Sequence, residues 1–382
     1  MDTERTQQSS GVADICELLD KLHGMDAEKI QEAAKAEERK LIRTIEPDPE
    51  LLHPRQADFE SKYLNMSAAG HPVTFEELFD AYMACEPIYL VGWTGGGKTT
   101  IGEALVDRAN AETLEANRRT FEANVKAFKA GTPQDGLGGY EPLPHTLKTL
   151  QGHEETRAAD LVGETGIAYT DDGRRQIVEV QGAALESAIH GWTLLVDEGD
   201  AIPAGVHAQC HGLFDKRVRR MSFWLNGRRD YVKHPEFRVI FTGNTKGENE
   251  NAIEYAHSQA QSKALMNRMA YVVTVGYMEK EAEVSLLKKR VPDADPGVVG
   301  KMVDCANSVR RLYKDGAISL VISTRDIEAW LRAAQRKAGR TGGLSERDFW
   351  TKVVVPAAGP TVLNKTSDEA AAEAAARYLA WK

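Results

Sequence analysis

The sequence predicts an α/β fold: a parallel β-sheet covered by helices on both faces, followed by a helical C-terminal part. Short apolar runs, typical of buried parallel strands, alternate with helical patterns. A glycine-rich segment directly follows the first of these runs and leads into a helix. Beyond about Gly276 the strand-like runs stop, and helical patterns continue to the end of the sequence.

Composition and charge restrict the class of protein. The 382 residues are 42% hydrophobic and 27% charged, with a formal net charge of −9, which is typical of a soluble globular chain of two or three domains. No apolar run approaches the ~18 to 20 residues of a membrane helix, and the polar N-terminus does not resemble a signal peptide. Four widely spaced cysteines suit a reducing compartment. We therefore expect a cytoplasmic protein without membrane contact.

Three domains are expected. Residues 1–70 form an N-terminal helical extension that ends in a proline-containing linker. Residues 71–276 form the α/β domain, which opens with a helix capped by Thr74, with Glu77 completing a capping box. Residues 277–382 form a helical C-terminal domain, and its alanine-rich tail favours a helix.

Within the α/β domain, the predicted strands are "IYLV" (88–91), "TLLVD" (193–197), "RVIFTGN" (238–244) and "AYVVTV" (270–275). Residues 165–180 and 221–234 each predict a β-hairpin, because an Asp-Asp-Gly or Asn-Gly turn joins two β-prone runs. The Gly- and Pro-rich residues 131–144 predict a surface insertion.

The glycine-rich segment "GWTGGGKTT" fits the pattern G-x-x-x-x-G-K-[ST] between a buried strand and a helix. Such glycines let backbone N–H groups surround phosphate oxygens at a helix N-terminus. Lys98 is expected to reach the β- and γ-phosphates, and the Thr99 hydroxyl to bind Mg²⁺. A glycine-rich turn with a chance lysine is the alternative, which the strand–loop–helix context disfavours. The predicted nucleotide-binding residues are Gly92, Trp93, Thr94, Gly95, Gly96, Gly97, Lys98, Thr99 and Thr100.

Two acids end the second apolar run. Asp197 is expected to be a carboxylate for Mg²⁺, and Glu198 the base that orients the attacking water. By itself, the pair fits an ordinary acidic strand end equally well. Together with the phosphate-binding pattern it predicts a hydrolytic site.

Three more polar residues could serve the nucleotide. Asn244 ends a strand, where its amide could bond both the γ-phosphate and the attacking water. Arg268 precedes the last strand and could reach a nucleotide in a neighbouring subunit. Arg325 lies in the first turn of a helix capped by Ser323 or Thr324, where a cation is disfavoured unless an anion is near. A strand-ending Asn and solvent-facing arginines are the plainer alternatives.

These elements, in this order, resemble the AAA+ ATPases over residues 71–345. The resemblance implies a five-stranded parallel sheet with hairpin insertions and a helical lid. It also implies ATP and Mg²⁺ as cofactors, and ATP hydrolysis at the subunit interfaces of a ring, expected to be a hexamer. Arg219 and Arg220 remain alternatives for the arginine finger. In the family's terms the sites are Walker A (92–99), Walker B (Asp197, Glu198), sensor 1 (Asn244), the arginine finger (Arg268) and sensor 2 (Arg325).

A narrower resemblance is to the MoxR-like branch, in which Asp-Leu-x-Gly opens a hairpin insertion, as within residues 152–166. Residues 234–245 and 256–287 look most like the ATPase subunit of aerobic cobaltochelatase. This resemblance implies a motor that remodels a client, often a protein with a von Willebrand A domain, with a link to metal insertion. The chain departs from the pattern in its Gly95–Gly97 run and in a longer insertion at 111–144, so the client stays open.

Two weaker signals leave alternatives open. Basic residues at 216–221 and in the second hairpin, with Trp224 and Tyr231 nearby, suit nucleic-acid contact in a ring pore, as in a restriction or phage motor. The negative net charge favours a solvated face or a grip on an acidic partner. His207 and His211, one helical turn apart, could bind a transition metal, but packing is the commoner role of such residues.

Overall fold

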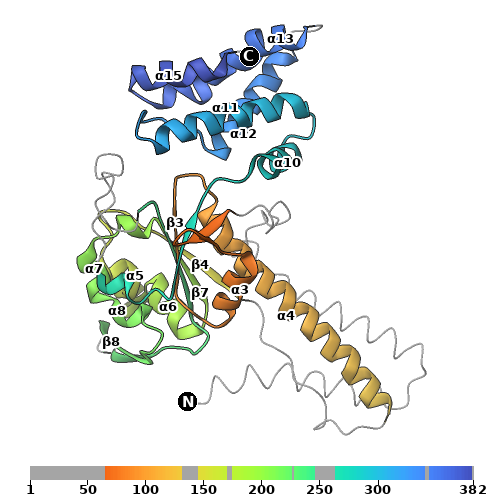
Figure 1. Ribbon diagram of the computed structural model, residues 1–382. Coiled ribbons are helices and arrows are strands. Elements are labelled where there is room, and N and C mark those ends of the chain that lie inside the picture. The colour runs from red at the N-terminus through yellow and green to blue at the C-terminus, as the bar shows by residue number, and fades with distance from the viewer. Residues whose placement is uncertain are drawn as a thin grey trace. The chain divides into compact units, whose positions relative to one another are not determined.

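The computed structural model describes most of the chain as two compact units (Figure 1). Of the described residues, 104–130 and 145–147 belong to one unit and all others to the second. The predicted N-terminal extension, except Asn65–Gly70, and the predicted insertion 131–144 lie outside the described residues. The described ranges are 65–130, 145–169, 174–225, 228–245, 263–339 and 344–380.

The main sheet has seven strands in the order β2-β1-β11-β3-β10-β7-β4. Pairing is parallel between β11 and β3, β3 and β10, and β10 and β7. These four strands are the four predicted apolar runs, so the α/β prediction is confirmed. The strands are β1 (Met66–Ala68), β2 (His71–Pro72), β3 (Ile88–Gly92), β4 (Leu147–Gln151), β7 (Thr193–Asp197), β10 (Arg238–Gly243) and β11 (Tyr271–Val275).

The sheet is larger than the five-stranded parallel one that the resemblance implies. Strand β1 pairs antiparallel with β11, and β2 pairs antiparallel with β1. Both strands are too short for a hydrophobic period to be visible, and β2 is exposed. The sheet therefore includes Met66–Ala68, which the sequence analysis placed in the N-terminal extension.

The strand register gathers several chain segments at one edge of the sheet. Val275 of β11 and Gly92 of β3 are paired, and Gly243 of β10 is paired with Val91. Since these strands are parallel, the segments that follow them leave the sheet at its carboxyl edge, where open α/β sheets bind ligands. Every residue of β3 and β10 is buried, so packing holds the two strands in place at this edge.

Helices and two hairpins lie between the strands of the sheet in the sequence. Thr74 caps α3 (Phe75–Met83) with Glu77 in the predicted capping box. Both predicted hairpins are confirmed, as the antiparallel pairs β5–β6 and β8–β9. The other elements of this part are α4 (Lys98–Lys129), α5 (Ala158–Val162), β5 (Gly163–Tyr169), β6 (Arg175–Gln181), α6 (Ala183–His190), η4 (Gly199–Ala201), α7 (Ala204–Gln209), α8 (His211–Phe214), β8 (Arg220–Leu225), β9 (Arg228–Val232) and α9 (Lys263–Met266).

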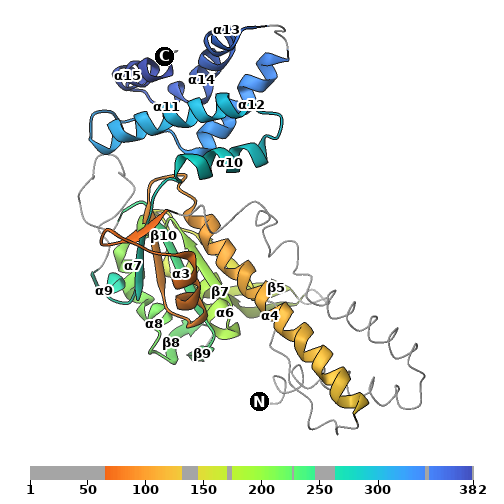
Figure 2. The same ribbon diagram turned by 45° about the vertical axis from the view of Figure 1, so that its right-hand side comes forward.

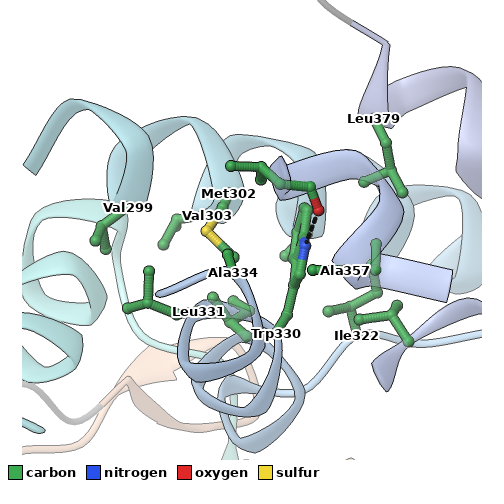
Figure 3. Close-up of a cluster of buried hydrophobic side chains, with 14 of the residues drawn as sticks. Val299, Met302, Val303, Ile322, Trp330, Leu331, Ala334, Ala357 and Leu379 are labelled. Atoms are coloured by element: carbon green, nitrogen blue, oxygen red, sulfur yellow. Dashed lines mark hydrogen bonds between the residues drawn. The ribbon is translucent and has the colours of Figure 1, made fainter. Parts of the chain in front are cut away.

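In the C-terminal part, called the lid below, all described secondary-structure elements from 280 onward are helices or helical turns, as predicted (Figure 2). Its core surrounds Trp330, which is fully buried and whose Nε1–H donates to the Val354 carbonyl at 2.7 Å (Figure 3). Its helices are α10 (Lys280–Arg290), α11 (Pro296–Lys314), α12 (Thr324–Ala338), α13 (Glu346–Phe349), a π-helical turn (Trp350–Val354), α14 (Val355–Thr361), a 3-10 turn (Leu363–Lys365) and α15 (Glu369–Leu379). Among the described helices, none has the length and apolar character needed to cross a membrane.

Candidate nucleotide-binding site

The glycine-rich segment forms the bend between β3 and α4, and two of its glycines are required by close approaches. A Cβ atom on Gly92 would lie 2.1 Å from the Val275 carbonyl oxygen. Gly95 has φ +74°, and a Cβ atom there would lie 2.5 Å from Ser323 Cβ. Any side chain at either position would collide with its neighbour. The bend leads directly into α4 at Lys98, so the first-turn N–H groups, which have no partner within the helix, lie at this bend.

Lys98 is held at the centre of the bend. Its side-chain ammonium donates to the Gly92 carbonyl at 2.7 Å, the Trp93 carbonyl at 3.1 Å and Asn244 Oδ1 at 3.0 Å. The residue is only 9% exposed. A phosphate oxygen could replace these neutral acceptors and would form the stronger, charge-assisted hydrogen bond.

Burial weakens the hold of Lys98 on its proton. Loss of solvation lowers the pKa of the ammonium from 10.5 to about 8, although Asp200, Asp197 and Glu198 act in the opposite direction. The site therefore disfavours the charged form of Lys98 more than water does, although with a pKa of about 8 the ammonium is still mainly protonated at pH 7.

Asp197 lies at the end of β7 beside two hydroxyl groups. Its Oδ1 accepts from Thr99 Oγ1 at 2.9 Å and also from Thr242 Oγ1. A carboxylate next to a threonine hydroxyl is the oxygen donor set that Mg²⁺ prefers, with water and phosphate oxygens completing its shell. The residues present therefore fit Mg²⁺.

Glu198 is exposed at the same edge, in an uncommon backbone conformation. Its φ of 53° and ψ of 40° lie in the left-handed region, and its N–H donates to Thr242 Oγ1 at 3.1 Å. On the following turn, the Gly199 carbonyl is 3.1 Å from Nε2 of the fully buried His207. Neighbouring contacts thus hold the Glu198 backbone in a strained turn.

Asp200, which the sequence analysis did not single out, holds the segment after β10. The residue is 1% exposed, and its Oδ2 accepts from the N–H groups of Asn244 at 2.8 Å and Thr245 at 3.1 Å. Tyr89 donates its hydroxyl to the Thr245 carbonyl at 2.7 Å. Asn244 is thereby fixed with its amide oxygen on Lys98. The signal available in the sequence was the second acid after "LLVD", which is indistinguishable from an ordinary acidic loop residue.

Arg268 lies away from the glycine-rich bend in space. It precedes β11, whose Tyr271 is paired with Ile88 at the start of β3, so it lies at the amino edge of the sheet, opposite the bend. Its Nε is 3.7 Å from Asp215 Oδ2. The structure thus does not bring Arg268 together with the glycine-rich bend of its own chain, residues 92–99, which is called the phosphate bend below.

Arg325 lies in the first turn of α12, as predicted, and is exposed. Ser323, one of the two candidates, is the N-cap, and Asp326 completes a capping box. Since Ser323 touches Gly95, the N-terminus of α12 lies beside the phosphate bend.

Some of the basic residues at 216–221 and in the second hairpin form contacts within the protein. Lys216 pairs with Glu86 at 2.6 Å. Lys233 is 4% exposed and donates to three backbone carbonyls between residues 212 and 215. Tyr231 is fully buried and therefore cannot stack on a nucleic-acid base. His207 is also buried, and within the described part of the chain no three His, Cys, Asp or Glu side chains are placed to share a metal ion.

Comparison with known proteins finds a matching family model and similar curated proteins. Residues 141–268 match the family model of the AAA domain (dynein-related subfamily). The chain is 31% identical to the aerobic cobaltochelatase subunit CobS of Sinorhizobium sp over 180 residues, which are 46% of this chain and 53% of that protein. It is 28% identical to the gas vesicle ATPase GvpN of Ancylobacter aquaticus over 176 residues, 42% of this chain and 46% of the relative. The chain thus spans about half the length of the curated relatives it matches.

A solved structure of the Thermotoga maritima RuvB Holliday junction branch migration motor also aligns, at 9% identity and a TM-score of 0.41 over 75% of this chain and 68% of that one. The family match covers Asp197, Glu198 and Asn244 but not the phosphate bend, which follows β3, the neighbour of β10 in the sheet. The family match and the two relatives confirm the predicted resemblance to the AAA+ ATPases.

Proposed function

We propose that the chain binds ATP with Mg²⁺ at the phosphate bend and hydrolyses it. The observation that carries this proposal is the meeting of three groups at the carboxyl edge of one sheet. These are the Lys98 ammonium on Asn244, the Thr99 hydroxyl on Asp197, and the exposed Glu198 carboxylate beside them. Such an arrangement supplies a phosphate cation, a metal carboxylate and a base within one site.

The bend would hold the phosphates. Its backbone N–H groups and those at the start of α4 would donate to phosphate oxygens. The Lys98 ammonium, which donates to the Gly92 and Trp93 carbonyls, could donate to phosphate oxygens instead. Thr99 and Asp197 would hold Mg²⁺, which when bound neutralises charge that develops on the phosphates. The proposed nucleotide-binding residues are Gly92, Trp93, Thr94, Gly95, Gly96, Gly97, Lys98, Thr99 and Thr100.

Glu198 and Asn244 would act on the attacking water. The exposed carboxylate of Glu198 can accept a proton from that water, and the Asn244 amide, fixed through its backbone by Asp200, can orient it. Arg325, at the N-terminus of α12, would contact the γ-phosphate of its own subunit.

Arg268 would act in a neighbouring subunit. Its place at the amino edge of the sheet puts it far from its own bend, so a catalytic role for this arginine requires a second copy of the chain. We accordingly propose a ring, with a hexamer as the expected form, and ATP sites at the interfaces between subunits.

The ATPase proposal is tested by steady-state phosphate release from ATP with Mg²⁺. The wild type should turn over, and Lys98→Ala should lose ATP binding and activity together. Glu155→Gln, in an exposed loop, is the matched surface control and should behave as wild type. Normal ATP affinity in Lys98→Ala would contradict the site.

A mixing experiment tests the shared site. Arg268→Ala keeps its own phosphate bend, and Lys98→Ala keeps its own arginine. Mixed rings should therefore regain activity at those interfaces where an intact bend meets an intact arginine. Mixed oligomers that form, as shown by light scattering, but stay inactive would exclude Arg268, and Arg219 and Arg220 would then be tested in the same way.

We further propose that ATP turnover in the cytoplasm remodels a client protein, with metal insertion as one outcome. The likeness to a cobaltochelatase subunit and to a gas vesicle ATPase supports a protein client. The alternative, a nucleic-acid motor, is less well supported because Lys216, Tyr231 and Lys233 are committed to internal contacts. Tagged Glu198→Gln held with ATP and Mg²⁺ in its native host should retain a protein such as a von Willebrand A-domain subunit. Recovery of nucleic acid or a nuclease would favour the alternative.

A further inference from the structure

The phosphate bend is attached to the lid through an aromatic residue. Tyr277, which lies between β11 and α10, donates its hydroxyl to the Thr94 carbonyl at 2.8 Å. The Trp93 ring packs on Tyr277 with 5.9 Å between ring centroids, and edge-on to Tyr313 of α11 at 5.5 Å. Two consecutive residues of the bend therefore contact the segment that enters the lid.

Behind Tyr277 lies a buried ion pair. The Arg310 guanidinium stacks over the Tyr277 ring at 3.9 Å from its centroid, within the range of a cation–π interaction. Two of its nitrogens donate to the two carboxylate oxygens of Glu283, each at 2.8 Å. The Arg310 side chain is 5% exposed and that of Glu283 is fully buried. This bidentate geometry fixes the plane of the guanidinium and hence its face on the tyrosine.

The same ion pair holds the start of α12. Arg310 Nε donates to the Ile322 carbonyl at 2.7 Å, and the Thr324 hydroxyl donates to Glu283 Oε1 at 2.6 Å. Thr324 is the first residue of α12, and Arg325 is the next. A continuous set of contacts therefore runs from the Thr94 carbonyl through Tyr277, Arg310 and Glu283 to the residue before Arg325.

We infer that Tyr277, Arg310 and Glu283 are positioning residues, which set the place of Arg325 relative to the phosphates. This inference rests on the proposed ATPase function. Helix packing alone would account for an ion pair between α10 and α11. It does not account for the extension of the pair onto Tyr277 and the bend on one side and onto Thr324 on the other. Since a bidentate pair tolerates little rotation, a shift of the bend would be transmitted to the N-terminus of α12.

The test begins with Tyr277→Phe, which removes one hydroxyl and keeps the ring. We expect kcat for ATP hydrolysis to fall about 2- to 10-fold, the effect of one hydrogen bond on a rate. Thermal stability and ADP affinity should stay near wild type, because Arg325 would act on the γ-phosphate that ADP lacks. Arg332→Lys is the lid control, since Arg332 forms a half-exposed pair with Glu328, and it should match wild type.

A double-mutant cycle with Arg325→Ala separates positioning from a general structural role. If Tyr277 acts through Arg325, then Tyr277→Phe should cause no further loss of kcat once Arg325 is absent. Independent losses that multiply would overturn the inference, and so would wild-type kinetics in Tyr277→Phe. A wild type without ATPase activity would contradict the proposed function itself, whereas an active wild type with an unaffected Tyr277→Phe would contradict the inference alone.

Discussion

Asn244 Oδ1 accepts a hydrogen bond from Lys98 Nζ at 3.0 Å, which joins two segments 146 residues apart in the sequence. The bond exists because β3 and β10 are parallel neighbours, so that both residues leave the sheet at its carboxyl edge. Each residue constrains the other before any phosphate arrives. Lys98 is thereby kept in the bend and Asn244 is kept oriented toward the place where a γ-phosphate would lie.

The buried lysine predicts a pH dependence of nucleotide affinity. Its pKa of about 8 in the free protein lies below the usual 10.5, so the ammonium loses its proton as pH rises through about 8. Bound phosphates would favour the charged form, and ATP binding above pH 8 should then take up a proton. Affinity should fall by up to about tenfold per pH unit above 8. Calorimetric titration at pH 7, 8 and 9 checks this, and a flat affinity would show that Lys98 stays protonated.

The same shift has a consequence for stability. The folded-state pKa is lower than that of the unfolded chain, so folding disfavours the ammonium. The resulting destabilisation is fully present below pH 8 and disappears as pH rises from about 8 toward the unfolded value of about 10.4. Replacing Lys98 with Met should therefore stabilise the nucleotide-free protein at pH 7, as measured by chemical denaturation. The gain should shrink at pH 10.

Glu198→Gln should bind ATP but turn it over at least about a hundredfold more slowly, because the amide cannot accept a proton from water. Equilibrium binding of a fluorescent ATP analogue and single-turnover hydrolysis measure the two effects separately. Glu155→Gln is the matched control. A Glu198→Gln protein with normal turnover would remove this residue from the mechanism.

Thr242→Val should weaken both the metal site and the fold. The hydroxyl is buried, donates to Asp197 and accepts from the Glu198 N–H, so its loss leaves two polar groups short of a partner. We expect a cost of about 1 to 3 kcal/mol in unfolding free energy and a higher Mg²⁺ concentration for half-maximal activity. Thr242→Ser keeps the hydroxyl and should retain the metal response. If Val and Ser variants respond alike to Mg²⁺, the hydroxyl does not orient Asp197.

Glu283→Ala should destabilise the lid by about 3 to 5 kcal/mol, because it leaves the Arg310 charge buried without its carboxylate. Replacing both residues with Met should restore most of that stability. Glu346→Ala, which removes a largely exposed pair with Lys301, should cost about 1 kcal/mol or less. Urea denaturation monitored by tryptophan fluorescence compares the variants. Equal losses of unfolding free energy in Glu283→Ala and Glu346→Ala would mean that the buried pair contributes no more to stability than the exposed one.

The strands and the bend were predictable because their signals are local. Four apolar runs and one glycine pattern each occupy fewer than ten residues, and the register then follows from parallel pairing. Strands β1 and β2, of which β2 lies at the edge of the sheet, were not predictable, since three- and two-residue strands carry no visible period.

The supporting residues of the site could not be predicted, because their partners are remote in sequence. Asp200 holds residues 44 and 45 positions away, and Tyr277 contacts Thr94 across 183 positions. Nothing in the local sequence distinguishes Asp200 from a loop acid or Tyr277 from a lid residue. Arg268 shows the reverse case, because its local sequence suggests an arginine finger, whereas the strand register puts it at the edge of the sheet opposite the bend, so that the proposed role would need a second subunit.

At Glu198 the left-handed backbone conformation favours another residue for stability, whereas the proposed reaction needs the carboxylate. Glycine or asparagine occupies that conformation at lower cost than glutamate does, by roughly 1 kcal/mol. Mutational drift under selection for folding alone would therefore remove the carboxylate, whereas selection for turnover would keep it. In a copy of this chain that binds the nucleotide but no longer hydrolyses it, we expect Glu198 to be replaced first, while the phosphate bend stays unchanged.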